Sequence, residues 1–151
     1  MDKSLTEAKR VFEAEIEELI KVKDRLDENF SKMVDMIYES KGKVVITGIG
    51  KSGHIGKKIS ATLASTGTNS VFINAAEALH GDLGVIKKGD IVLAISNSGN
   101  SDEISNILPS IRRIGADIIN NNIIKIRFFT LKYLLNNQKI LFIFIFPYFL
   151  I

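Results

Sequence analysis

The sequence contains no cysteine, and it has only two histidines and two prolines among its 151 residues. Without cysteine the chain forms no disulfide, offers no thiolate nucleophile and builds no cysteine-ligated metal centre. This composition is typical of a reducing compartment, so we expect a cytoplasmic protein. The N-terminus is charged from Asp2 onward, which argues against a signal peptide.

Acidic residues are missing from the last part of the chain. Residues 121–151 contain no Asp or Glu but four basic residues, Lys125, Arg127, Lys132 and Lys139. The whole chain has 20 basic and 17 acidic side chains, a formal charge of +3, so residues 1–120 hold 16 basic against 17 acidic side chains. The basic balance is therefore a property of the tail, and we expect no nucleic-acid partner.

Residues 121–151 also lack Gly, Ala, Val and Ser, and 27 of these 31 residues are Ile, Phe, Leu, Asn, Lys or Tyr. Those six residue types share A/T-rich codons. We therefore interpret 121–151 as an aberrant tail produced by out-of-frame translation, with no domain of its own. The alternative is a membrane anchor, but the apolar run 140–151 is twelve residues long and contains Pro147. A spanning helix needs about 20 residues, so we expect no membrane segment.

Apolar residues recur at three- and four-residue steps over residues 4–39, which predicts one long amphipathic leading helix. Ser4 and Glu7 have the spacing of a capping box at its start. The polar face is rich in Glu and Lys. Two interpretations stay open, a solvated surface helix and a helix that packs across a partner subunit.

Three apolar runs, at 43–47, 71–73 and 91–95, alternate with helical patterns in the rest of residues 1–120. The first helical pattern ends at Gly67, which suits a left-handed C′ position, and the second begins near Ser101 and contains Pro109. The run 91–95 is apolar throughout, as in parallel strands covered on both faces. We predict an α/β fold, a three-layer doubly wound parallel sheet that is incomplete at its C-terminus.

A glycine turn follows the first predicted strand. Gly48, Gly50 and Gly53 match the spacing of the dinucleotide fingerprint between a strand and a helix. The second strand, however, ends at Asn74 without the acidic residue that would bind a ribose hydroxyl. An NAD-binding fragment is therefore kept only as an alternative. A P-loop is rejected, because that motif needs glycine where this chain has Val45.

A second polar turn follows the third predicted strand. Ser96, Ser98 and Ser101 place three hydroxyls within six residues, and Gly99 allows close approach of a ligand. An ordinary helix cap needs one serine, so the pattern favours an anion site at a helix N-terminus. Glu103 lies in the first helical turn, where it either complements the helix dipole or acts as a general base.

The two histidines differ in context. His80 lies between Glu77 and Asp82, in a loop expected at the carboxyl ends of the strands, where catalytic side chains gather. We interpret His54 as a structural or surface residue rather than a catalyst. The spacing of these groups supports a metal site only weakly, and we expect no metal and no cofactor.

Four segments together carry a family resemblance: Gly-Ile-Gly-Lys-Ser-Gly-His-Ile-Gly (48–56), Ala-Ser-Thr-Gly-Thr (64–68), Glu-Ala-Leu-His-Gly-Asp-Leu-Gly (77–84) and Ser-Asn-Ser-Gly-Asn-Ser-Asp-Glu (96–103). In order and spacing they resemble the sugar isomerase (SIS) domain of D-arabinose 5-phosphate isomerases, from about residue 5 to 119. The resemblance implies an aldose–ketose isomerase that interconverts ribulose 5-phosphate and arabinose 5-phosphate, toward Kdo in lipopolysaccharide or capsule. The partner would be a small sugar phosphate, and the family is homotetrameric.

The resemblance also implies roles for individual residues. Catalytic positions would be Lys51, Glu103 and His80. Sugar-phosphate contacts would come from Ser52, Gly67, Thr68, His80, Ser96, Asn97, Ser98, Gly99 and Ser101. Aldose–ketose isomerisation needs a base to move a proton and a positive group beside the developing oxyanion, which suits Glu103 and Lys51.

The sequence departs from the family in two respects. Asn74 stands where the family often has histidine, which puts any metal role there in doubt. The family's later strands, a second glutamate, a catalytic histidine and the CBS domains would follow residue 120, and none is recognisable there. We therefore expect little isomerase activity from this chain. A non-catalytic phosphosugar-binding module is the other alternative.

Overall fold

The computed structural model describes residues 2–96, 98, 99 and 101–119. Its centre is a parallel four-stranded sheet in the order β2-β1-β3-β4. The strands are β1 (Val44–Gly48), β2 (Ser70–Asn74), β3 (Ile91–Ile95) and β4 (Asp117–Ile119). In register, Val44 of β1 lies level with Ser70 of β2 and Ile91 of β3, so these three strands end at one edge.

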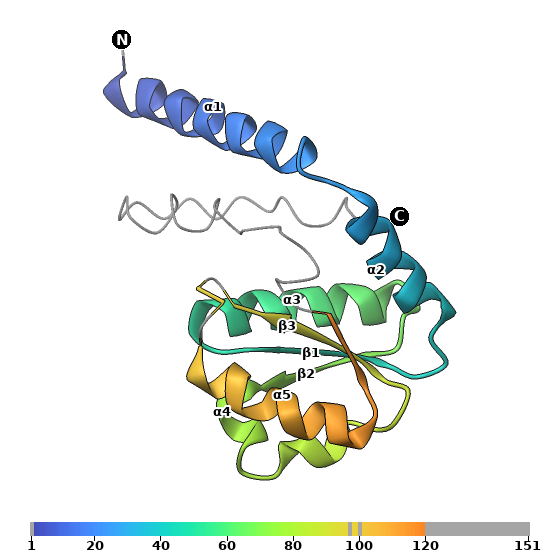
Figure 1. The fold of residues 1–151 in the computed structure, drawn as a ribbon. Coiled ribbons are helices and arrows are strands. Elements are labelled where there is room, and N and C mark those ends of the chain that lie inside the picture. Colours follow the sequence, from blue (N-terminus) through green and yellow to red (C-terminus); the bar gives the residue numbers. More distant parts are fainter. Residues whose placement is uncertain (1, 97, 100, 120–151) are drawn as a thin grey trace.

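Helices cover both faces of this sheet (Figure 1). Helix α3 (Gly50–Ser65) lies on one face, and α5 (Asp102–Ile114) lies on the other with the short α4 (Ala75–Ala78). A 3-10 turn, η1 (Asp82–Val85), follows α4. The helix–sheet–helix layering confirms the predicted three-layer α/β fold. The predicted aberrant tail, 121–151, lies outside the described residues.

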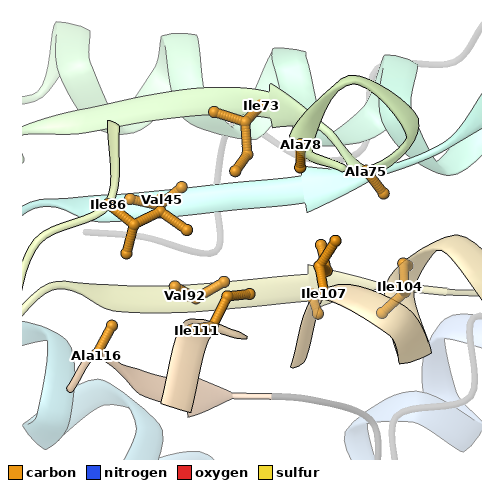
Figure 2. Packing of buried hydrophobic residues seen from close by; sticks show 11 residues of the cluster. Val45, Ile73, Ala75, Ala78, Ile86, Val92, Ile104, Ile107, Ile111 and Ala116 are labelled. Carbon is orange, nitrogen blue, oxygen red and sulfur yellow. The ribbon is translucent and has the colours of Figure 1, made fainter. Parts of the chain in front are cut away.

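Each face of the sheet has its own apolar cluster, because successive strand side chains point to opposite faces. On the α3 side Val44 and Ile46 pack with Leu63. On the other side Val45 packs in a larger cluster with residues of α4 and α5 (Figure 2). Its buried members are Val45, Ile73, Ala75, Ala78, Ile86, Val92, Ala94, Ile104, Ile107, Ile111 and Ala116.

The end of α3 confirms the predicted glycine C′ position. Gly67 has φ of +97° and its N–H donates to Ala64 O at 3.2 Å, while Thr68 N–H donates to Leu63 O at 2.9 Å. This pair of bonds is the Schellman motif, which satisfies carbonyls of the last helical turn.

The prediction of a single leading helix over 4–39 is wrong. The segment forms two helices, α1 (Lys3–Lys23) and α2 (Glu28–Glu39), and α1 extends as an arm away from the sheet (Figure 1). The helical segment is interrupted before Asp27, because the Asp27 carboxylate accepts the N–H of Asn29 at 2.9 Å and caps a new helix. The predicted cap at Ser4 is also wrong, since Asp2 caps α1 by accepting the Ser4 N–H at 2.9 Å.

Further elements were not predicted. Residues 75–85, expected as a loop, contain α4 and η1, and β4 forms directly after α5. Pro109 lies inside α5, yet the helix continues to Ile114. The apolar side of α5, with Ile107 and Ile111 fully buried, offsets the hydrogen bond that proline removes.

At the amino edge of the sheet, where its strands begin, one buried carboxylate bonds to the segments that lead into β1 and β3. Asp90 is 3% exposed, accepts backbone N–H groups from Lys43 at 3.0 Å and Lys87 at 2.8 Å, and pairs with Lys43 Nζ at 2.5 Å. Burial alone would raise the pKa of Asp90, but these bonds outweigh it and hold the pKa below its ordinary value. Gly42 lies so close that a Cβ there would meet Gly89 O and the Asp90 backbone.

Candidate functional site

The connections of the sheet reverse between β1 and β3, so the carboxyl ends of these strands form a topological switch point; the region directly beyond them is called the crevice below. The chain leaves β1 into α3 on one face and leaves β3 into α5 on the opposite face, although β1 and β3 are neighbours. Their last residues, Gly48 and Ile95, lie level with each other. In open α/β sheets ligands bind outside the carboxyl ends of the strands at such a switch point. The two predicted motifs follow these two strands, so the topology brings them to one place.

The turn after β1 is built from close backbone approaches. A Cβ on Gly48 would lie 3.1 Å from Ser52 C and 3.2 Å from Ile95 O, so a side chain there would have to displace the start of α3 or the end of β3 slightly. Lys51 and Ser52 therefore lie in the first turn of α3, directly beyond the end of β1. The Lys51 side chain is exposed and that of Ser52 is half-buried.

The turn after β3 is held by serine hydroxyls. Ser96 is 8% exposed, its Oγ lies 2.9 Å from Ser101 Oγ, and Gly99 N–H donates to it at 3.0 Å. Ser98 is exposed, and Asn97 lies outside the described residues. Two of the three predicted hydroxyls thus contact each other and define the shape of the turn.

The helices at the crevice differ from the others in their capping. Helices α1, α2 and α4 are capped by the side chains of Asp2, Asp27 and Asn74, each of which accepts a backbone N–H near 3 Å. The cap residues of α3 and α5, Ile49 and Ser101, make no such side-chain bond in the described part of the chain. The positive ends of two helix dipoles therefore lie beside the crevice without a capping side chain from the N-cap residue, an arrangement that favours an anion.

The predicted acid–base pair flanks this crevice. Lys51 lies in the first turn of α3 and Glu103 in the first turn of α5, so they approach the switch point from opposite faces of the sheet. Glu103 is half-buried. A cation on one side and a carboxylate on the other could stabilise an oxyanion and move a proton on a ligand held between them.

The histidines are both exposed. His80 follows α4 on the α5 side of the sheet, and its backbone N–H donates to the backbone carbonyl of Glu77 at 2.8 Å. His54 lies in α3 and is exposed, which favours the surface role of the two roles left open for it. Among residues 2–96, 98, 99 and 101–119, no group of three or more His, Asp or Glu side chains is arranged to hold a metal ion.

Two predicted ligand contacts lie elsewhere. Gly67 and Thr68 follow the last turn of α3, whose 16 residues span about 24 Å from the crevice. Within one copy of the chain they therefore lie near the amino edge of the sheet, away from Lys51 and the serine turn.

The sequence patterns missed the capping role of Asn74 and did not mark Thr47 at all. Asn74 caps α4 by accepting Ala76 N–H at 3.0 Å, a role that its place before a four-residue helix did not reveal. Thr47, next to the last residue of β1, is fully buried, and its hydroxyl has no partner among the described residues. A threonine in a strand carries no pattern that would have marked it.

Comparisons with known proteins agree with the motifs. A family model described as SIS domain matches residues 36–120. Arabinose 5-phosphate isomerase KdsD of Francisella tularensis is 50% identical over 122 residues, which are 79% of this chain and 37% of that protein. The same-named protein of Pseudomonas aeruginosa is 55% identical over 95 residues, 63% of this chain and 29% of that protein.

A solved structure of c3406 from E. coli CFT073, determined as a ligand complex, superposes with a TM-score of 0.69 and 40% identity, covering 80% of this chain and 64% of that one. Of the two curated isomerases, in contrast, the chain spans only about a third of the length. No helix among the described residues is long and apolar enough to cross a membrane. With a family match over more than half its length on a matching fold, the chain belongs to the SIS domain family.

Proposed function

We propose that this chain forms the sugar-phosphate site of an aldose–ketose isomerase that interconverts ribulose 5-phosphate and arabinose 5-phosphate. The observation that supports it most is the crevice at the switch point, where two helices without side-chain caps begin beside the serine turn. The phosphate binds at the N-terminus of α5, where first-turn N–H groups and hydroxyls can donate to its oxygens. The identity to arabinose 5-phosphate isomerases supports the choice of sugar.

The sugar extends from the phosphate toward α3. Glu103 removes the proton from C2 of the aldose and returns it to C1, while the hydroxyl proton on O2 moves to O1. The cis-enediolate between these steps is negatively charged, and Lys51 stabilises it across the crevice. His80 and Ser52 contribute hydrogen bonds to the sugar from the rim of the site.

We also infer that the working form contains more than one copy of the chain. The apolar side chains of Leu5, Phe12, Ile16 and Ile20 on α1 are about half exposed, and a row of exposed apolar side chains on one helix favours association. Gly67 and Thr68 lie at the other edge of the sheet and would reach a ligand only in a neighbouring copy. Sedimentation equilibrium of the chain tests this, with Phe12→Glu expected to shift it toward the monomer and Glu17→Gln, on the polar side of α1, expected to leave it unchanged.

The function is tested by ligand-induced thermal stabilisation with arabinose 5-phosphate. At about 100 times its dissociation constant a ligand adds roughly 2.7 kcal/mol to the free energy of unfolding. We expect a rise in Tm for the wild type, a much smaller rise for Lys51→Ala and Ser98→Ala, and a wild-type rise for Lys41→Ala, an exposed lysine away from the crevice. No rise with the wild type would contradict the proposed site.

A direct assay of interconversion separates the enzyme from its alternatives. Because the resemblance puts further catalytic groups beyond residue 120, we expect binding to be clear and turnover to be low. Binding with no turnover above the uncatalysed rate would favour a non-catalytic phosphosugar-binding module. A fluorescence titration with NADH tests the dinucleotide alternative, for which saturable binding would be required.

A further inference from the structure

Asn74, the last residue of β2, has a side-chain amide whose position is set by its surroundings. Its Oδ1 accepts the backbone N–H of Ala76 at 3.0 Å. Its chain neighbours Ile73 and Ala75 are buried in the apolar cluster on the α5 side of the sheet (Figure 2). The bond from Ala76 also identifies which end of the amide is the oxygen, because only the oxygen accepts a hydrogen. The backbone and the carboxamide of Asn74 are therefore in place before a ligand binds.

The amide nitrogen of Asn74 has two hydrogens to donate. No described residue accepts a hydrogen from Nδ2, and the atom is not buried. The cap of α4 uses only the oxygen, and serine or aspartate caps a helix about as well as asparagine. Capping therefore explains the oxygen of this side chain, whereas its nitrogen is open to a ligand.

Asn74 lies beside the start of α3. It is level with Gly48 of β1, at the edge where β1 and β3 also end together. A Cβ on Gly48 would meet Ser52 of α3, and level residues of neighbouring strands share a face, so the Asn74 side chain leaves the sheet on the α3 side. Phe72, two residues earlier on the same face, agrees with this, because its ring lies 3.5 Å from the place of a Cβ on Gly53 of α3.

This position corresponds to one end of the proposed ligand. In the proposed complex the phosphate binds at the N-terminus of α5, beyond β3. Neighbouring strands lie about 4.8 Å apart, so in the order β2-β1-β3 the end of β2 is roughly 10 Å from the end of β3. A sugar that extends from the phosphate toward α3 brings C1, its end farthest from the phosphate, to the side of β2. Lys51 in the first turn of α3 and Asn74 then flank this end of the sugar.

We propose that Asn74 is a sugar-binding residue whose Nδ2 donates to the oxygen on C1, and this inference rests on the proposed function. A carbonyl and a hydroxyl oxygen both accept a hydrogen, so the contact forms with the aldose and with the ketose. It orients the C1 oxygen beside Lys51 without adding charge. Inorganic phosphate has no such group, so Asn74 favours the sugar phosphate over the free anion.

The test compares Asn74→Ser, which keeps a capping oxygen but loses the amide, with Asn74→Ala, which loses both. Titration calorimetry measures the dissociation constants of arabinose 5-phosphate and of inorganic phosphate, and thermal unfolding measures Tm without ligand. We expect both variants to weaken arabinose 5-phosphate roughly three- to tenfold and to bind inorganic phosphate within about twofold of the wild type. Only Asn74→Ala should lower Tm. Asn69→Ser, an exposed asparagine just before β2 at the amino edge, is the matched control and should leave both constants unchanged.

The two ligands and the two variants separate the possible results. Wild-type affinity of Asn74→Ser for arabinose 5-phosphate would overturn the proposal, because Asn74 would then serve only as the cap of α4. An equal loss of affinity for both ligands, or a lower Tm of free Asn74→Ser, would overturn it as well, since the amide would then act on the phosphate end or on the fold. If the wild type binds arabinose 5-phosphate, these results contradict the role of Asn74 alone. A wild type that does not bind the sugar phosphate contradicts the proposed function and the role of Asn74 together.

Discussion

The two edges of the sheet are built in opposite ways. At the amino edge a nearly buried carboxylate, Asp90, satisfies two backbone N–H groups and a lysine, and the backbone beside it at Gly42 has no room for a side chain. At the carboxyl edge two helices begin without side-chain caps, Gly50 has open space around it, and Lys51 is exposed.

This difference separates stability from function within one small sheet. Polar groups at the amino edge satisfy one another, so changes there should act on folding. At the carboxyl edge Lys51 and Ser98 are exposed and no carboxylate of the described residues joins the strands as Asp90 does, so changes of these two side chains should act on binding with little effect on folding. The following substitutions test that separation.

Asp90→Ala should have the largest effect on the free energy of unfolding. It leaves the Lys43 ammonium and the N–H groups of Lys43 and Lys87 without their acceptor, and breaking a largely buried pair costs about 3–5 kcal/mol. Urea unfolding followed by circular dichroism measures the change. The exposed pair of Lys32 and Glu28 is the control, and Glu28→Ala should cost less than about 1 kcal/mol. Equal costs for the two substitutions would show that the amino edge is not a special anchor.

Gly42→Ala should come next. Its Cβ would lie 2.7 Å from Asp90 Oδ1 and 2.8 Å from Asp90 Cα, and because backbone cannot move aside cheaply we expect a loss of about 3 kcal/mol. Gly50→Ala is the matched change at the other edge. Gly50 has φ of +55° and nothing near its missing Cβ, so only the left-handed backbone disfavours alanine, at about 1–2 kcal/mol. The same denaturant series ranks the two, and a larger loss at Gly50 would reverse the comparison.

The pH dependence of stability should also point to Asp90. Burial by itself raises the pKa of this carboxyl, but the Lys43 side chain and the N–H groups of Lys87 and Lys43 together lower it beneath its ordinary value of 3.8. Since the folded pKa is the lower one, the stabilisation is fully present above the ordinary value and is lost as the pH falls through the folded value. The stability difference between wild type and Asp90→Asn should therefore shrink below about pH 4. Urea midpoints at pH 7, 4 and 3 measure it, and a difference that stays constant over this range would contradict the assignment.

Elements of the fold were predictable from the sequence where local interactions define them, and were missed where they depend on one side chain or on very few residues. The three apolar runs and the Gly67 helix end were predictable because strand periodicity and C-capping are local. The break between α1 and α2 was missed because apolar spacing continues through it, while the Asp27 cap that ends it is one side chain. Strand β4 was missed because three residues are too short to show alternation.

The candidate site was predictable in its parts and not in its assembly. Lys51, the serine turn and Glu103 were identified as motifs, but only the strand order shows that the two motifs flank one switch point. The same order places Gly67 and Thr68 at the opposite end of α3. Pairing between Asp90 and Lys43 joins residues 47 apart in the chain, and no spacing rule reveals such a contact.

Lys51→Ala should have the smallest effect on folding and so gives the sharpest test of the comparison. The side chain is exposed, and substitutions of exposed residues usually change the free energy of unfolding by less than about 0.5 kcal/mol. If Lys51 pairs with an anionic ligand, losing a charged hydrogen bond worth about 1.5–3 kcal/mol should weaken arabinose 5-phosphate binding by more than tenfold. Calorimetric titration and urea unfolding of the same preparation measure both quantities. A stable variant that has lost affinity would place function at the carboxyl edge alone, whereas a loss of stability comparable with that of Asp90→Ala would mean that both edges hold the fold together.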